Sequence, residues 1–210
     1  MVSAPNNSQE LLHRACAGDA QALPELFARH RDRLRRMVRL RLDRRLQGRV
    51  DPSEVVQQAW ASISERIGEC PPGTSTFLWM RKLTGERLQA LHQEYFGATV
   101  DFAGQDVSLY RGALPEANSV SLAAQLLGRL TPAAQEAERA EKQLRLQEAL
   151  NGMNPLDREI LALRHFEELS NQEASHVLGM SPTEASKLFI QALKRLKDIV
   201  SSIPGFLQHP

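Results

Sequence analysis

The sequence predicts an all-α protein built from two small helical domains. Apolar residues recur at helical spacing through most of the 210 residues, and no run of alternating, β-branched residues predicts a strand. With 42% hydrophobic and 24% charged residues, the chain can bury one sizeable core or two small ones. Several predicted helices start at a capping side chain followed by proline, which favours the same fold class.

These capping signals locate the helix starts. At residues 51–54, Asp51 can cap, Pro52 occupies the first helical position and Glu54 can return to the cap. Three later pairs of a capping residue and a proline are Thr131-Pro132, Asn154-Pro155 and Ser181-Pro182. Two pairs fit the capping box, Ser170 with Glu173 and Ser181 with Glu184.

A change in composition divides the chain into domains. Residues 97–131 are richer in Gly, Ser, Asn and Asp and lose clear periodicity, so we interpret them as an interdomain linker. This leaves an N-terminal helical domain at residues 1–96 and a C-terminal one at 132–210. The linker also holds apolar residues such as Leu109 and Tyr110, which can dock either in a partner's groove or on the protein's own domains.

Several classes of protein are disfavoured by what the sequence lacks. No stretch approaches the eighteen or so apolar residues of a membrane span, and the N-terminus has no signal-peptide pattern, so we expect a cytoplasmic protein. Cys16 and Cys70 lie far apart and outside any Cys/His cluster, so we expect reduced thiols and no metal. No motif typical of catalysis or cofactor binding occurs, so we expect neither an enzyme nor a cofactor.

Positive charge is concentrated in the N-terminal domain. Residues 1–96 carry 15 cations and 11 anions, a net +4 in a chain whose total is +1. Ten arginines fall within residues 29–49, interleaved with apolar residues, which predicts a very basic amphipathic helix. Such a helix is either a solvated outer face or a surface for phosphates or an acidic partner protein.

The C-terminal domain has the pattern of a helix-turn-helix. Three short helices follow one another from Asn154, and Gly179, Met180 and Ser181 separate the second from the third. Glycine there can adopt the positive φ that ends one helix and redirects the chain. Ala174 and Ala185 are apolar where the motif requires it, and Ser175 is small where its helices cross.

The third of these helices has one polar side that fits a DNA major groove. Its outward residues are Thr183, Glu184, Ser186, Lys187, Gln191, Lys194 and Arg195. Residues near its N-terminus would reach base edges, while Lys194 and Arg195 lie where phosphates would run. The alternative is a plain three-helix bundle. Because residues 141–210 carry a net charge of −1, we expect modest DNA affinity from this domain alone.

In the N-terminal domain, an amphipathic helix over residues 51–67 precedes a proline-rich loop at 68–76. The loop and the basic residues after it, Arg81, Lys82 and Arg87, suit single-stranded bases and their backbone. Phe77 and Trp79 are more typical of a core than of a stacking surface, so we place base recognition on the loop and the cations.

Over residues 8–200 the chain resembles a bacterial sigma factor of the sigma-70 superfamily, of the short extracytoplasmic-function (ECF) type. The segment DPSEVVQQAW is similar to the DxxDLxQExF-type segment that grips the β′ clamp helices of RNA polymerase. The segment ELSNQEASHVLGMSPTEASKLFIQALKRLK is similar to the region 4 helix-turn-helix. The linker segment VSLYRGALPEANSVSLAAQLLGRLTP resembles that of a subgroup of these sigma factors common in planctomycete-type bacteria.

The resemblance implies partners and roles for individual residues. The partners are core RNA polymerase, through its β′ clamp helices and β flap, and promoter DNA; an anti-sigma factor is left open as a further partner. The residues expected to dock on polymerase are Asp51, Glu54, Gln57, Gln58 and Trp60. Those expected at the −10 element are Cys70, Thr74, Ser75 and Thr76 in the loop, which captures a flipped base, with Arg81, Lys82 and Arg87 beside the opening strand.

For the −35 element the resemblance assigns duplex reading to Thr183, Glu184, Ser186, Lys187 and Gln191. Leu188, Ile190 and Leu193 stand where some relatives have Arg or His, so the bases that are recognised stay open.

Two other function classes remain as alternatives. A stand-alone helix-turn-helix regulator would bind duplex DNA tightly without polymerase. A helical adaptor would bind only proteins, and substitutions at Lys187 and Gln191 would then be harmless. An enzyme is least favoured, because no nucleophile, metal site or paired carboxylate is recognisable.

Overall fold

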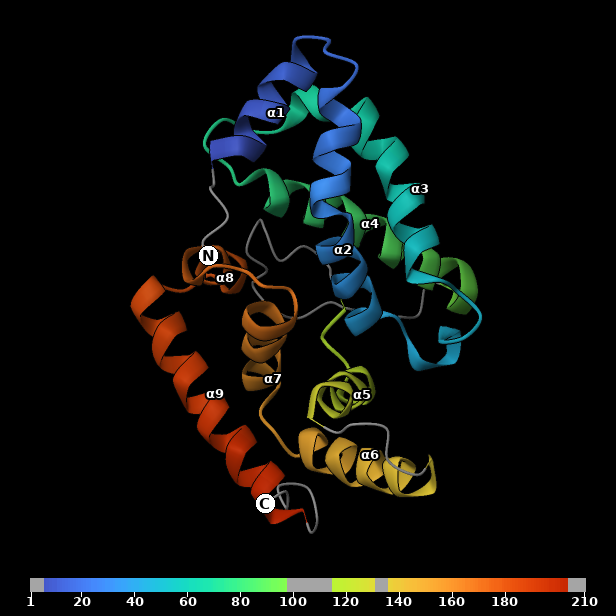
Figure 1. Ribbon diagram of the computed structural model, residues 1–210, viewed down its shortest axis with the longest axis vertical. Coiled ribbons are helices and arrows are strands. Elements are labelled where there is room, and N and C mark those ends of the chain that lie inside the picture. Colours follow the sequence, from blue (N-terminus) through green and yellow to red (C-terminus); the bar gives the residue numbers. More distant parts are fainter. Residues whose placement is uncertain (1–5, 98–114, 131–135, 204–210) are drawn as a thin grey trace. The chain divides into compact units, whose positions relative to one another are not determined.

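The computed structural model describes residues 6–97, 115–130 and 136–203, and within these ranges the regular structure is entirely helical (Figure 1). The predicted all-α class is therefore confirmed. The chain separates into two compact units, residues 1–115 and 116–210, and each is described by itself.

Unit 1 is built around three long helices. In chain order its elements are α1 (Asn6–Cys16), α2 (Ala22–Arg41), η1 (Arg44–Leu46), α3 (Pro52–Glu65), η2 (Ile67–Glu69) and α4 (Thr76–Phe96). Helix α2 packs against α1, α3 and α4, and α3 packs against α4. Buried side chains from all three long helices form the core, among them Leu34, Met37, Val55, Ile63 and Leu88. Phe77 and Trp79 are 2% and 6% exposed, which confirms their predicted place in the core.

Unit 2 holds the predicted helix-turn-helix. Its elements are α5 (Ser119–Leu130), α6 (Glu136–Asn151), α7 (Pro155–Leu161), the π-helical turn η3 (Ala162–Phe166), α8 (Asn171–Leu178) and α9 (Pro182–Ser202). Helix α5 packs on α6, and α9 packs on α7 and α8. The carboxylate of the buried Glu159 on α7 accepts the backbone N–H of Ala117 at 3.2 Å, so the start of unit 2 is tied to its helical core.

The linker expected at residues 97–131 differs from what the structure shows over its last third. Residues 119–130 form helix α5, whose Leu122 and Leu127 are buried within unit 2. The Gly, Ser and Asn residues upstream obscured the apolar periodicity that begins at Val120, and packing on α6 supplies the stabilisation that local propensity does not. The part of the predicted linker at 98–114 and the predicted cap at Thr131 lie outside the described residues.

Candidate nucleic-acid and polymerase interfaces

The turn between α8 and α9 is defined by several local hydrogen bonds. Both predicted capping boxes are present, one pairing Ser170 with Glu173 and the other pairing Ser181 with Glu184. Gly179 ends α8 in the left-handed region with φ of 67°, as its place in the sequence predicted. The side chain of Asn171 then donates to the carbonyl of Pro182 at 2.7 Å, joining the first turns of the two helices. The bond from Asn171 joins α9 to α8, and the Ser181 capping box fixes the first turn of α9.

Helix α9 presents the predicted DNA-reading residues to solvent. All seven are exposed: Thr183, Glu184, Ser186, Lys187, Gln191, Lys194 and Arg195. The opposite side of the helix buries Ala185, Ala192 and Val200. The polar face expected from the sequence is therefore present on a single, uninterrupted helix.

Two of these seven side chains are already engaged within unit 2. The Glu184 carboxylate accepts from the Ser181 hydroxyl at 2.7 Å and from the Ser181 backbone N–H at 2.8 Å, and these bonds hold the pKa of Glu184 below its ordinary value. Arg195 is ion-paired with Asp157, a carboxylate that is otherwise buried in α7. The role of Glu184 in the capping box was predicted, whereas the ion pair of Arg195 with Asp157 was not.

In unit 1, the predicted polymerase-binding residues lie along α3. Asp51 caps this helix by accepting the Ser53 N–H at 2.7 Å, and that bond is the main reason that its pKa lies below the ordinary value. Arg35 and Arg39 of α2 also lower the pKa of Asp51, so the basic helix places positive charge near the start of α3. Glu54, Gln57 and Gln58 are exposed on α3.

Trp60 has a mixed position. It is only partly exposed, and its ring packs on Phe27 of α2 with the ring centroids 4.4 Å apart. The side chain therefore helps to hold α3 on α2 while leaving part of the indole accessible.

Arg87, which was expected beside the opening DNA strand, contacts Gln58, which was expected to dock on polymerase. Its guanidinium donates to the Gln58 side chain at 2.9 Å and to the Glu94 carboxylate at 2.7 Å. The bond to Arg87 lowers the pKa of Glu94. Gln58 on α3 and Arg87 on α4 were assigned to different partners, yet they are direct neighbours on one surface.

The loop before α4 contains the residues expected to capture a base. Thr74 and Ser75 are partly exposed, and burial raises the pKa of the Cys70 thiol to about 11, so this thiol stays protonated at neutral pH. Thr76 is only 2% exposed, and its hydroxyl has no hydrogen-bond partner among the described residues. In this conformation Thr76 is not accessible to a base, which differs from its predicted role.

Arg81 also differs from the prediction. Its side chain is fully buried in α4, whereas the sequence analysis placed it beside a DNA strand. The helical register explains this, because Phe77, Met80 and Thr84 are buried around it and the same side of α4 faces the core. Lys82, the next residue, is partly exposed and lies 4.0 Å from Glu86. Of the two neighbouring cations, Lys82 is therefore accessible and Arg81 is not.

The arginine-rich segment is only partly a solvent-facing surface. Arg29, Arg31 and Arg39 are exposed, but Arg41 is 2% exposed. Arg33 lies over the ring of Phe77, 3.6 Å from its centroid. The segment therefore combines a basic outer face with arginines that contribute to packing, a role that the sequence analysis did not consider.

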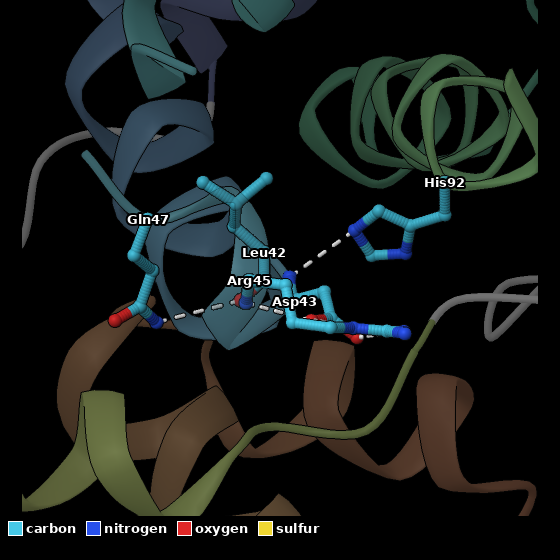
Figure 2. Close-up of polar contacts among 5 residues, drawn as sticks. All are labelled: Leu42, Asp43, Arg45, Gln47 and His92. Carbon is cyan, nitrogen blue, oxygen red and sulfur yellow. Dashed lines mark hydrogen bonds and ion pairs between the residues drawn. The ribbon is translucent and has the colours of Figure 1, made fainter. Parts of the chain in front are cut away.

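A contact that the sequence analysis missed joins the connection after α2 to the end of α4. Figure 2 shows the His92 ring facing the backbone nitrogen of Asp43, whose N–H donates to His92 Nε2 at 3.2 Å. The Asp43 carboxylate caps η1 and pairs with Arg45 at 3.0 Å, and the guanidinium of Arg45 lies over the ring of Phe96. No local pattern connects residues 43 and 92, so the sequence carried no signal for this contact.

The described part of the chain holds no group of three or more His, Cys, Asp or Glu side chains placed to bind a metal ion. Within the same ranges, no helix combines the length and the apolar character needed to cross a lipid bilayer.

A capped helix-turn-helix whose second helix exposes a polar face is a structural class of DNA-binding proteins. Comparison with known families makes this class more specific. Residues 143–196 match the family model described as "Sigma-70, region 4".

A solved structure resembles the whole chain. It is described as the structure of CnrH in complex with the cytosolic domain of CnrY, with 18% sequence identity and a TM-score of 0.56. The alignment covers 93% of this chain and 98% of the CnrH chain. A search of curated proteins gave no significant match. The family match thus covers residues 143–196, and the likeness to the CnrH structure is a likeness in fold.

Proposed function

We propose that this protein binds core RNA polymerase and directs promoter-specific initiation, melting the −10 element with unit 1 and reading the −35 element with unit 2. The observation that carries the proposal is the exposed polar face of α9 within a matched sigma-70 region 4 domain. In this role the polymerase supplies the catalysis and the protein supplies promoter selection, so it is not itself an enzyme.

The docking surface for polymerase is the exposed side of α3, with Glu54, Gln57 and Gln58 at its centre and part of Trp60 at its edge. Asp51 acts here mainly through its cap on the helix. Because Arg87 bonds Gln58 directly, polymerase bound to α3 would lie next to the cations that face the opened strand.

At the −10 element, Thr74 and Ser75 of the loop remain the accessible candidates for contact with a flipped base, and Lys82 and Arg87 for contact with the DNA backbone. At the −35 element, Glu184 and Arg195 are engaged by bonds within unit 2. The other five predicted residues face outward and are therefore the strongest candidates for base and phosphate contacts: Thr183, Ser186, Lys187, Gln191 and Lys194.

An anti-sigma protein is a further proposed partner. The support is the likeness in fold to CnrH, which was solved in complex with the cytosolic domain of CnrY. Such a partner would compete with polymerase for this protein, and the competition would be seen as a loss of core polymerase binding when the partner is added.

The direct test is run-off transcription from a genomic promoter pool with core polymerase and the full-length protein. Asp51 is left unchanged because its substitution would weaken the helix cap. The polymerase-surface variant is Glu54→Arg with Gln57→Arg, and its matched control is Glu65→Arg at the far end of the same helix. Promoter-dependent transcripts should be lost in the first variant and kept in the control.

A second variant, Lys187→Ala with Gln191→Ala, tests the role of α9. The proposal expects a changed set of responding promoters with core binding intact. If wild-type protein gives no transcripts but binds duplex DNA tightly without polymerase, the stand-alone regulator is correct instead. If Lys187→Ala with Gln191→Ala matches wild type both in run-off transcription and in duplex DNA binding, the protein-only adaptor is favoured.

A further inference from the structure

The proposed DNA-reading face of α9 contains one large apolar side chain. Ile190 is 51% exposed, although α9 buries its apolar residues on the opposite side at Ala185 and Ala192. Residues three and four positions apart are neighbours on a helix, so Ser186, Lys187 and Lys194 surround Ile190. An exposed isoleucine is therefore centred among the residues that face outward.

The exposure of the nearby Leu193 has a different explanation. Leu193 is 39% exposed, but with Leu196 it lines a small apolar pocket of about 80 Å³ inside unit 2. The other lining residues come from α5, α6, α7 and η3 and do not include Ile190. Leu193 thus belongs to the edge of the core, whereas Ile190 lies on the outer face.

An apolar group on a major-groove surface has one specific partner among the four bases. Thymine alone carries a C5-methyl group at the groove edge; cytosine has only a hydrogen at C5, and the purines present hydrogen-bonding groups there. Isoleucine offers no polar atom and cannot form hydrogen bonds, so its only favourable contact with a base edge is an apolar one. The polar and cationic neighbours of Ile190 can meanwhile contact bases and phosphates.

We propose that Ile190 is a specificity-determining residue that selects a T·A base pair in the −35 element by contacting the thymine methyl group. This inference deepens the proposed function and rests on α9 entering the major groove. The size of a buried methyl contact predicts about a fourfold preference for thymine over a base that lacks the methyl group.

The test removes the methyl group from the DNA without changing base pairing. Wild-type protein with core polymerase first selects −35 elements from a random duplex library. Each recurrent thymine is then replaced by deoxyuridine, which keeps the Watson–Crick edge, and binding of the holoenzyme is measured. We expect one position at which deoxyuridine weakens binding about fourfold.

The variant Ile190→Ala should bind the thymine-containing element about fourfold more weakly than wild type and should no longer distinguish thymine from deoxyuridine. Because residue 190 is exposed and alanine favours helix, this substitution should leave the fold intact. The matched control is Leu144→Ala, which truncates an exposed aliphatic side chain on α6 (55% exposed) and should keep the full preference for thymine.

Three results would overturn the proposal: wild type that is indifferent to deoxyuridine at every position, a selected −35 element without thymine, or Ile190→Ala that retains the preference. Failure of the proposed function would be recognised separately. In that case the holoenzyme would select no −35 element from the library at all.

Discussion

Charged side chains contribute to the interior of unit 1 as well as to its surface. Arg41 and Arg81 are both buried, and Arg33 packs its guanidinium on Phe77. The long side chain of a buried arginine fills space in a core and contributes to its packing. At the residue scale, the number of arginines in unit 1 therefore overstates the charge available for DNA.

Truncation of Arg81 tests this structural role. We expect Arg81→Ala to lower the free energy of unfolding by about 3 kcal/mol, because it removes a fully buried side chain and leaves a cavity. The measurement is urea denaturation of the full chain followed by circular dichroism. Lys82→Ala, at the partly exposed neighbouring position, is the control and should change stability by less than about 0.5 kcal/mol. Equal, small effects of both substitutions would show that Arg81 does not contribute to the core.

His92 makes stability depend on pH. It must be neutral for Nε2 to accept the Asp43 N–H, and burial lowers its pKa, with Arg45 acting in the same direction and Asp43 in the opposite one. The unfolded chain, where the pKa is about 6.5, therefore takes up the proton more readily than the folded chain. The stabilisation is complete above about pH 6.5 and decreases as the pH falls below that value.

Replacing His92 with glutamine keeps a hydrogen-bond acceptor but removes the titration. We expect the free energy of unfolding to fall less between pH 7.5 and pH 5.5 in His92→Gln than in wild type. Urea denaturation across this pH range gives the comparison. His13→Gln, at an exposed position on α1, should follow the wild-type curve. An unchanged pH dependence in His92→Gln would show that the Asp43 contact does not control this titration.

At the scale of single elements, α9 is defined at its N-terminus by chemistry within four residues. The hydroxyl of Ser181 accepts the N–H of Glu184 at 3.2 Å, and the Glu184 carboxylate returns to Ser181. Asn171 adds a bond from α8 to the Pro182 carbonyl. The start of the helix proposed to read DNA is consequently held by these hydrogen bonds without DNA, which would lower the entropy cost of docking.

Removal of this cap should weaken both the helix and its function. Ser181→Ala should lower the free energy of unfolding of unit 2 by about 1 kcal/mol, since the N–H of Glu184 loses its acceptor. Thermal unfolding measures the change, and Ser186→Ala, an exposed serine in the same helix, is the matched control. A control that destabilises unit 2 as much as Ser181→Ala would exclude the cap as the cause.

At the scale of the whole molecule, two units each have their own buried core. Unit 1 buries residues of α2, α3 and α4, and unit 2 buries residues of α5 to α9. A division of the chain at residues 115 and 116 therefore leaves both cores complete. Two units with separate cores suit the proposed contact with two promoter elements at once.

Fragments cut at this boundary test that arrangement. Residues 1–115 and 116–210, expressed separately, should each show helical circular dichroism and a cooperative urea transition. The boundary expected from the sequence, after residue 131, would remove α5 from the second fragment and expose Leu146 and Leu150 of α6. A 132–210 fragment should therefore be less stable than 116–210. Equal stability of these two fragments would argue that α5 is not part of the unit 2 core.

The local features of the fold and of the α9 face were predictable from the linear sequence. The Ser170 and Ser181 capping boxes, the left-handed Gly179 and the outward residues of α9 depend on groups within about four positions of one another, which is the range of helix capping and helical periodicity. Three-dimensional packing settled the burial of Arg81 and Thr76, the docking of α5 on α6, and the bond between His92 and Asp43. The bond between His92 and Asp43 joins residues that are remote in the chain. Burial and helix docking depend on which surfaces meet in the fold rather than on the residues next in sequence.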